Sequence, residues 1–233
     1  MKHEFIETDN YLNCLAALEE LDSLPKDMDM MGLIYGGAGE GKSLIIEKLA
    51  NDLEAGLVRT RGTWTAKTML QDICFEIGLP DDGTASSLQT RLIEHLTEKK
   101  RILIIDEIDT LFQSNKKILL VVLRDIHDMA KIPIVLTGMQ DCEKIFQKDK
   151  YYYDRFARKV KMKERSLNDV RKLCNNSDVK IEDDLVKYLY ETYKSFRPIK
   201  GLITSLESVC ESSDLDTVDL STFKAMEVEL NHG

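Results

Sequence analysis

Short apolar runs alternate with helix-period segments from residue 31 to about residue 165 of the chain. Runs that are apolar throughout predict buried strands, whereas apolar residues three or four positions apart predict helices. We expect strands at Met31–Tyr35, Gly56–Thr60, Ile102–Asp106, Ile132–Thr137 and Lys159–Met162. The helices expected between them are Ser43–Leu53, Ala66–Ile77, Ser86–Thr97, Asn115–Met129 and Asp141–Phe146. This alternation predicts a parallel sheet with helices on both faces.

From Ser166 onward the pattern predicts helices alone. Ser166 followed three residues later by Asp169 indicates a helix cap. The helices expected after it are Ile181–Tyr193, Pro198–Cys210 and Leu220–Leu230. Ahead of the sheet, residues 1–30 carry one expected helix, Tyr11–Leu21. We therefore expect an N-terminal segment at 1–30, an α/β domain at 31–165 and a helical lid at 166–233.

The composition of the chain limits which molecules it can be expected to bind. The chain has 233 residues, of which 43% are hydrophobic, and a formal net charge of −9. This acidity argues against a protein that binds nucleic acid through overall positive charge, so a polyanion-binding surface must be local. The five cysteines are scattered, and no signal peptide or long apolar span is present. We therefore expect a soluble cytoplasmic protein with no disulfide, zinc site or membrane partner.

Residues 36–43 read Gly-Gly-Ala-Gly-Glu-Gly-Lys-Ser, a complete phosphate-binding loop between an expected strand and an expected helix. Glycines permit positive φ, which lets successive N–H groups converge on phosphates at a helix N-terminus. Lys42 would reach the β- and γ-phosphates of ATP, and the Ser43 hydroxyl would ligate Mg²⁺. The alternative is a glycine-rich turn with a chance lysine. The expected ATP-binding residues of this loop are Gly36, Gly37, Ala38, Gly39, Glu40, Gly41, Lys42, Ser43 and Leu44.

The apolar strand expected at Ile102–Asp106 is followed at once by a second carboxylate, Glu107. Parallel sheets place their ligands at the carboxyl ends of the strands. Asp106 would hold Mg²⁺ through its water shell, and Glu107 would polarise the water that attacks the γ-phosphate. The alternative is a buried strand ended by a capping Asp-Glu pair. Together with the loop, this pair predicts an ATPase with Lys42 and Glu107 as catalytic residues.

The two nucleotide motifs and the helices that follow them resemble the AAA+ ATPase superfamily. Within it, the chain is similar to the transposition ATPases of the phage Mu B and TnsC type. The stretches that carry this finer similarity are Phe5–Thr8, Thr65–Leu79, Gly83-Thr84 with Leu92–Leu96, and Ile104–Leu111. The resemblance implies an AAA+ P-loop NTPase fold with a five-stranded parallel sheet flanked by helices and a small C-terminal helical lid. It also implies ATP and Mg²⁺ as cofactors.

The resemblance assigns two sensor positions near the γ-phosphate. The stretch Ile134–Met139 occupies the sensor 1 place, where family members carry a polar residue. Met139 stands at that position, and Thr137 or Gln140 could substitute for it. Lys200 corresponds to the sensor 2 arginine and would contact phosphate as a point charge.

The resemblance also implies contacts with other molecules. Arg155 is our first choice and Arg158 our second for an arginine finger that completes a neighbouring subunit's ATP site. For each, a surface salt bridge or a polyanion contact is the alternative. Lys67 and Thr84 correspond to positions that line duplex DNA inside helical filaments or rings of related proteins. A nearby aromatic residue, Trp64, is read as core or interface rather than as a base-stacking residue.

Three functional hypotheses follow. The first is an ATP-dependent DNA-binding ATPase that forms homo-oligomers on duplex DNA, selects target DNA and recruits a transposase. The second is a helicase loader or replication-initiation ATPase, which would share every nucleotide-site residue and differ in its partner. The third is a nucleotide-gated scaffold with little hydrolysis.

Overall fold

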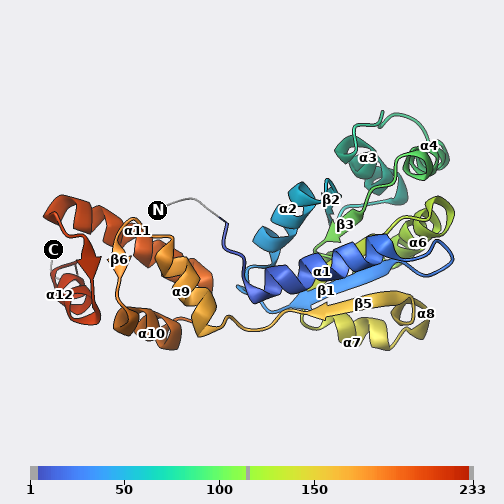
Figure 1. Ribbon diagram of the computed structural model, residues 1–233. Coiled ribbons are helices and arrows are strands. Elements are labelled where there is room, and N and C mark those ends of the chain that lie inside the picture. The colour runs from blue at the N-terminus through green and yellow to red at the C-terminus, as the bar shows by residue number, and fades with distance from the viewer. Residues whose placement is uncertain (1–4, 114–115, 231–233) are drawn as a thin grey trace. The chain divides into compact units, whose positions relative to one another are not determined.

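The computed structural model describes residues 5–113 and 116–230, with side chains up to residue 226. The described chain divides into two compact units. One holds residues 10–38 and 42–162, and the other holds the described parts of 1–9, 39–41 and 163–233. The first contains a five-stranded sheet and the second the C-terminal helices (Figure 1).

The first unit is built on a parallel sheet with the strand order β2-β3-β4-β1-β5. This arrangement confirms the predicted fold class. The strands β1 and β3 are buried along their whole lengths, as apolar runs inside a covered sheet should be. Basic residues interrupt the apolar pattern of β5, which therefore begins earlier than predicted. The strands are β1 (Met31–Gly36), β2 (Gly56–Arg59), β3 (Leu103–Asp106), β4 (Ile134–Met139) and β5 (Phe156–Lys161).

Helices cover both faces of this sheet. On one face, apolar residues of α3, α4 and α6 form a single core with Leu33, Ile105 and Leu136 of the strands. On the other face, α1 packs against β1, where a Cβ atom on Gly32 would lie 2.7 Å from the Leu21 Cδ1 atom (Figure 1). The helices of this unit are α1 (Asp9–Ser23), α2 (Lys42–Asp52), α3 (Ala66–Glu76), α4 (Ala85–Glu98), α5 (Asp109–Gln113), α6 (Ile118–Ala130), α7 (Cys142–Gln147) and α8 (Lys150–Tyr153).

Two of these helices, α5 and α8, were not predicted. They contain five and four residues, which is too short for a helical period to be recognised in the sequence. The predicted start of α6 at Asn115 lies outside the described residues. The predicted end at Met129 falls one residue short, since the helix ends at Ala130.

The second unit has its own core, formed by α9 (Leu167–Asn175), α10 (Asp183–Thr192), α11 (Phe196–Ser213) and α12 (Leu220–Leu230). The predicted cap is present, because the Ser166 side chain accepts from the Asp169 N–H and the Asp169 carboxylate accepts from the Ser166 N–H. The expectation of helices alone is wrong. Two-residue strands, β6 (Lys180–Ile181) and β7 (Thr217–Val218), pair in parallel, and their brevity hid them from the sequence pattern. Across the described residues we find no helix with both the length and the apolar character to span a bilayer.

Candidate nucleotide-binding site

The loop between β1 and α2 has a backbone that its glycines make possible. Gly39 and Gly41 both adopt φ of +83°, a region that side chains with a Cβ atom rarely enter. α2 begins at Lys42, so the exposed Ser43 side chain lies in the first turn of this helix. N–H groups of a first helical turn have no partner within the helix and can bind an anion. The observed backbone therefore fits the phosphate cradle predicted from the sequence.

The Lys42 ammonium group lies at the carboxyl ends of β1 and β4. Its Nζ atom donates to the Gly138 carbonyl at 2.6 Å and to the Gly36 carbonyl at 3.4 Å, with the Met139 sulfur 3.8 Å away. Parallel pairing places Gly36 opposite Met139, which brings these groups to one edge of the sheet. A phosphate at this edge would compete with the carbonyl oxygens for the ammonium.

Asp106, at the carboxyl end of β3, is 1% exposed. Its Oδ1 atom accepts hydrogen bonds from the Thr137 hydroxyl and from the Glu107 N–H, the latter at 2.9 Å. Its Oδ2 atom lies 3.5 Å from the guanidinium of Arg59. A buried carboxylate held in one orientation by several donors is suited to hold a hydrated cation.

Glu107 has φ of +59°, a conformation that costs a non-glycine residue about 1–3 kcal/mol. Two neighbours hold this turn: the Thr60 hydroxyl donates to the Glu107 carbonyl, and the next N–H, that of Ile108, donates to the Thr137 carbonyl at 2.9 Å. The Glu107 side chain remains 52% exposed. The strained turn thus directs one carboxylate outward while its neighbour Asp106 stays buried.

Arg59 is a residue of this edge that sequence reasoning did not assign to it. Its guanidinium lies 3.5 Å from carboxylate oxygens of Glu47, Asp106 and Glu107. Arg59 lies within the predicted strand Gly56–Thr60, but only the observed pairing of β2 with β3 places it opposite Asp106. The arginine offsets the negative charge that the acidic pair concentrates at the sheet edge.

The sensor 1 stretch is fixed by buried polar groups. Thr137 is fully buried with its hydroxyl on Asp106, whereas the Met139 side chain is 43% exposed. The Met139 N–H donates to Asp109 at 2.7 Å, and the Cys142 thiol donates to the same carboxylate at 2.7 Å. Burial, together with this hydrogen bond, raises the pKa of the Cys142 thiol. Asp109 is a second residue that the sequence analysis missed.

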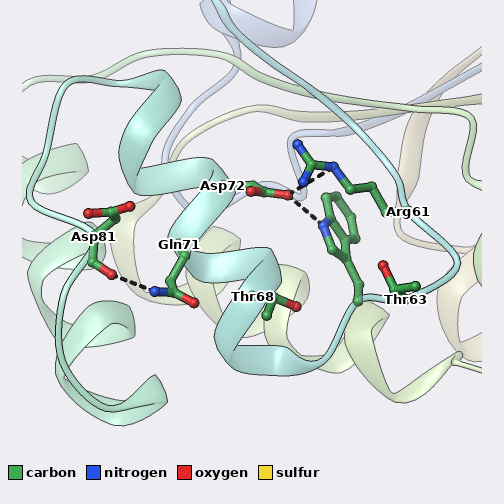
Figure 2. Close-up of a pocket in the computed structure, with 7 residues that line it drawn as sticks. Arg61, Thr63, Thr68, Gln71, Asp72 and Asp81 are labelled. Atoms are coloured by element: carbon green, nitrogen blue, oxygen red, sulfur yellow. Dashed lines mark hydrogen bonds and ion pairs between the residues drawn. The ribbon is translucent and has the colours of Figure 1, made fainter.

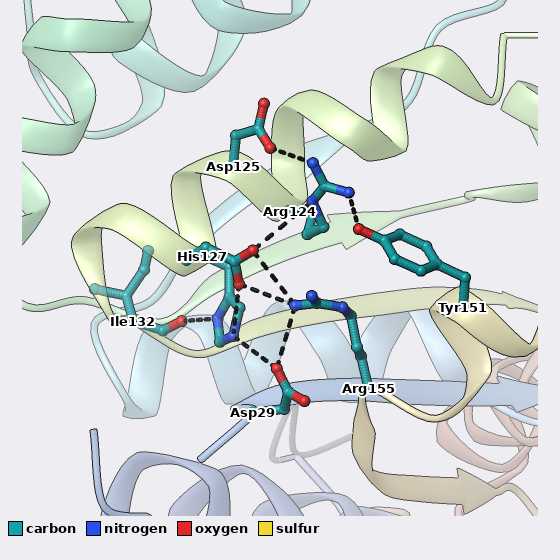
Figure 3. Close-up of polar contacts among 8 residues, drawn as sticks. Asp29, Arg124, Asp125, His127, Ile132, Tyr151 and Arg155 are labelled. Atoms are coloured by element: carbon teal, nitrogen blue, oxygen red, sulfur yellow. Dashed lines mark hydrogen bonds and ion pairs between the residues drawn. The ribbon is translucent and has the colours of Figure 1, made fainter. Parts of the chain in front are cut away.

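The two candidate arginine fingers lie elsewhere in the sheet unit. Arg155 precedes β5 and pairs with Asp29 and Asp128 (Figure 3), while Arg158 pairs through its Nε and Nη2 atoms with Glu20 of α1. Lys200 belongs to the second unit, where it is exposed on α11.

The two residues predicted to contact DNA both lie at exposed helix starts. Lys67 is in the first turn of α3, and Thr84 is the N-cap of α4, accepting from the Ser87 N–H at 3.2 Å. The Thr84 hydroxyl is therefore already used within the chain. Two acidic residues, Asp81 and Asp82, precede this cap.

A cavity of about 360 Å³ lies beside the start of α3. Trp64 lines it but is 2% exposed and belongs to the core, which confirms the reading of this residue as core. The Trp64 indole N–H donates to Asp72 at 2.7 Å, and the Arg61 guanidinium lies 3.5 Å from the same carboxylate. Figure 2 shows Asp72 and Arg61 facing each other at this cavity. The full lining is Arg61, Thr63, Trp64, Thr68, Gln71, Asp72 and Asp81.

A glycine-rich loop between a strand and a helix, with an acidic pair at the end of a neighbouring parallel strand, defines a P-loop nucleoside triphosphatase. The chain belongs to the AAA domain family, whose model matches residues 26–146. This family in general binds and hydrolyses nucleotides. A search among curated proteins gave no significant match.

Solved structures share this fold. The Aeropyrum pernix ORC2 protein in its ADPNP-ADP complexes is 15% identical, with 93% of this chain and 65% of that chain covered and a TM-score of 0.65. The Aeropyrum pernix ORC1 protein in complex with DNA is 16% identical, with 97% and 66% covered and a TM-score of 0.62. Domain III of the Thermotoga maritima replication initiation protein DnaA is 18% identical, with 94% and 91% covered and a TM-score of 0.60. The chain spans just under two thirds of the two ORC proteins, and the likeness establishes a common fold.

Proposed function

We propose that the chain is an ATP-dependent DNA-binding ATPase of the cytoplasm that assembles on duplex DNA and regulates transposition. The observation that carries the ATPase part is the grouping of Lys42, Asp106 and Glu107 at the carboxyl edge of one sheet, beside a glycine-rich loop. Selection of target DNA and recruitment of a transposase rest on the sequence resemblance to the Mu B and TnsC type.

Each residue of the edge has a role in this proposal. The loop N–H groups and Lys42 hold the phosphates, and Ser43 and Asp106 hold Mg²⁺, whose charge neutralises the phosphate oxygens when it is bound. Glu107 accepts the proton of the attacking water, for which its exposed side chain is suited. Thr137 acts on the nucleotide indirectly by orienting Asp106, because its hydroxyl is buried and bonded to that carboxylate.

In this proposal, assembly supplies the arginine that the γ-phosphate needs. Among the described residues, the guanidinium nearest to the acidic pair is that of Arg59, which is already surrounded by three carboxylates. An arginine finger from a second copy, Arg155 or Arg158, would stabilise the transition-state charge at the γ-phosphate. ATP would therefore favour the oligomer, and hydrolysis would release it.

In this proposal, Lys67 and Thr84 are the residues that contact DNA. One exposed lysine per subunit, repeated along a filament or ring, would contact the phosphate backbone without reading sequence. A net charge of −9 makes binding by a single copy unfavourable, so DNA binding and assembly would be coupled. That the similar ORC1 protein was solved in complex with DNA is in keeping with this proposal.

The test is assembly on DNA. With ATP, Mg²⁺ and duplex DNA, sedimentation and electron microscopy should show an oligomer on DNA that dissociates when ADP replaces ATP. Lys42→Ala should abolish it, whereas Lys48→Ala, on the same helix, should leave it unchanged. Failure of the wild type to assemble with ATP, or equal assembly with ADP, would refute the proposal.

A replication-initiation or helicase-loading role is the second candidate, favoured by the similarity to ORC proteins and to a DnaA domain. Capture of a replicative helicase rather than a transposase by the ATP-bound assembly would decide for it. A scaffold with little hydrolysis is the third. It would be supported by equally negligible phosphate release from the wild type, Glu107→Gln and Arg155→Ala.

A further inference from the structure

A second polar cluster lies in the sheet unit, formed by Asp29 ahead of β1 and by His127 and Asp128 at the end of α6 (Figure 3). His127 is 1% exposed although its side chain is polar. Its Nδ1 atom lies 2.8 Å from the Ile132 carbonyl. A carbonyl only accepts, so Nδ1 carries the hydrogen, and Nε2 of the neutral ring presents a lone pair.

This lone pair faces negative charge. The Asp29 and Asp128 Oδ1 atoms each lie 3.8 Å from the His127 Nε2 atom, which is longer than a hydrogen bond. In the part of the chain that the structure describes, Nε2 makes no hydrogen bond. A cation held between this lone pair and the two carboxylates would be stabilised by all three groups.

Arg155 now neutralises the two carboxylates without reaching the ring. Its Nη1 atom donates to Asp128 Oδ1 at 3.0 Å and to Asp29 Oδ1 at 3.3 Å, while its Cζ atom lies over the Tyr151 ring, 5.3 Å from the centroid. A second arginine borders the cluster: the buried Arg124 Nε atom has no hydrogen-bond partner among the described residues and lies 3.7 Å from Asp128 Oδ2. Arg124 can therefore hold one oxygen of Asp128 while the other turns to a new ligand.

We propose that Asp29, His127 and Asp128 bind a divalent transition metal of the Zn²⁺ class in exchange for the Arg155 guanidinium. The three ligand atoms already lie within 4.8 Å of one another. Tetrahedral Zn²⁺ with bonds of about 2.0–2.2 Å needs ligand atoms about 3.4 Å apart, so small side-chain rotations suffice. Donation of the second ring N–H to a backbone carbonyl is the arrangement that orients metal-binding histidines, and an imidazole ligand favours Zn²⁺ over Mg²⁺.

The exchange has a consequence that rests on the proposed function. Metal binding would leave Arg155 without its two carboxylates. The freed guanidinium could then reach the ATP of a second copy, so the metal would promote assembly. Asp125, the remaining acidic neighbour, pairs with Arg124 at 2.6 Å and would stay paired in both states.

The test is titration of the untagged full chain with Co²⁺, without nucleotide or DNA, followed by visible absorption and competition with Zn²⁺. We expect one equivalent of tetrahedral Co²⁺, displaced by Zn²⁺. Asp29→Asn and Asp128→Asn should each weaken binding at least about tenfold, and Arg155→Gln should tighten it. The two Asp side chains are 47% and 37% exposed, so both variants should fold. Asp125→Asn, on the same helix, is the matched control and should bind Co²⁺ as the wild type does. Asp106→Asn should also keep the Co²⁺ band, which would show that the ion does not bind at the nucleotide site.

Absence of a Co²⁺ band in both the wild type and Arg155→Gln would overturn the proposal, and so would a band that survives in both Asp29→Asn and Asp128→Asn. Because this titration contains no ATP, its failure is distinct from a failure of ATP-dependent assembly.

Discussion

At the residue scale, two adjacent carboxylates receive opposite environments from one backbone turn. Asp106 is buried and bonded to Thr137, whereas the positive φ of Glu107 turns the next side chain outward. The cost of that φ, about 1–3 kcal/mol, is met by the hydrogen bonds from Thr60 and Ile108. One carboxylate is thereby suited to a metal ion and the other to a reacting water.

Glu107→Gln should lower the rate of ATP hydrolysis by about 10²-fold or more while leaving nucleotide affinity within a few fold, because a neutral amide cannot accept the proton of the water. Single-turnover phosphate release and fluorescent-nucleotide binding measure the two effects. Glu47→Gln is the matched control, since Glu47 also lies 3.5 Å from Arg59 but is on α2. Equal loss of activity in both variants would mean that Glu107 acts by holding Arg59 and does not accept the proton of the water.

Thr137→Val should destabilise the sheet unit by about 1–3 kcal/mol, because it removes a donor from the buried Asp106 carboxylate. It should also raise the Mg²⁺ concentration needed for hydrolysis. Thr137→Ser keeps the hydroxyl and should restore both properties. Urea unfolding and Mg²⁺ titrations of phosphate release provide the readouts, and a Ser variant as impaired as the Val variant would contradict the positioning role.

Motifs made of neighbouring residues could be predicted from the sequence. Contacts between residues that strand pairing brings together could not. The loop at 36–43 and the pair Asp106-Glu107 are spelled by neighbouring residues, so their chemistry was predictable. Arg59 and Asp109 act on partners far along the chain, and their roles depend on which strands pair. Asp29 and Arg155 also meet through strand pairing, because they precede the neighbouring strands β1 and β5.

At the element scale, long periodic segments were predicted well and very short ones were not. The strands β1, β3 and β4 were expected near their observed places, because buried parallel strands are apolar throughout. The start of β5 was missed by three residues, because basic residues interrupt its apolar pattern. The pair β6 and β7 and the short helix α5 have too few residues to show a period.

Gly138→Ala should destabilise the unit and weaken nucleotide binding. A Cβ at residue 138 would lie 2.2 Å from the Cys142 sulfur and 3.0 Å from Asp109 Oδ2, and the Gly138 carbonyl accepts from Lys42. Overpacking of this kind costs about 1–3 kcal/mol. Cys142→Ala removes the sulfur and should recover part of that loss in the double variant. If the two effects simply add in urea unfolding, the clash is not the cause.

The start of α12 should make the C-terminal unit sensitive to acid. The N–H of Thr222, with the Thr222 and Ser221 hydroxyls, lowers the pKa of Asp219 from 3.8 to about 2. Since the folded pKa lies below the unfolded one, this stabilisation is present above pH 3.8 and is lost as the pH falls towards 2. Asp219→Asn should be less stable at neutral pH and show a smaller change over that interval. Asp216→Asn, an exposed neighbour, should follow the wild type in acid unfolding followed by circular dichroism.

At the scale of the whole molecule, the two units have separate cores, and charge is distributed unevenly along the chain. Nine Lys or Arg residues against three Asp or Glu fall between Lys144 and Arg165, within a chain of net charge −9. Several of these cations are already paired, as Arg155 and Arg158 are. If the proposed DNA binding holds, its affinity should depend on repetition of Lys67 over many copies and should fall steeply with salt.

The predicted division at residues 30 and 165 can be tested with fragments. A fragment of residues 10–162 should unfold cooperatively by itself, since it contains the sheet and every helix packed on it. A fragment of 31–162 lacks α1, whose Tyr11, Cys14, Leu18 and Leu21 are buried. Losing side chains worth about 1.5–3 kcal/mol each from a unit of about 5–15 kcal/mol should leave the shorter fragment unfolded or aggregated. Urea unfolding and size-exclusion chromatography measure this difference. Equal stability of the two fragments would instead show that residues 1–30 form a separate segment, because α1 would then contribute nothing to the sheet it covers.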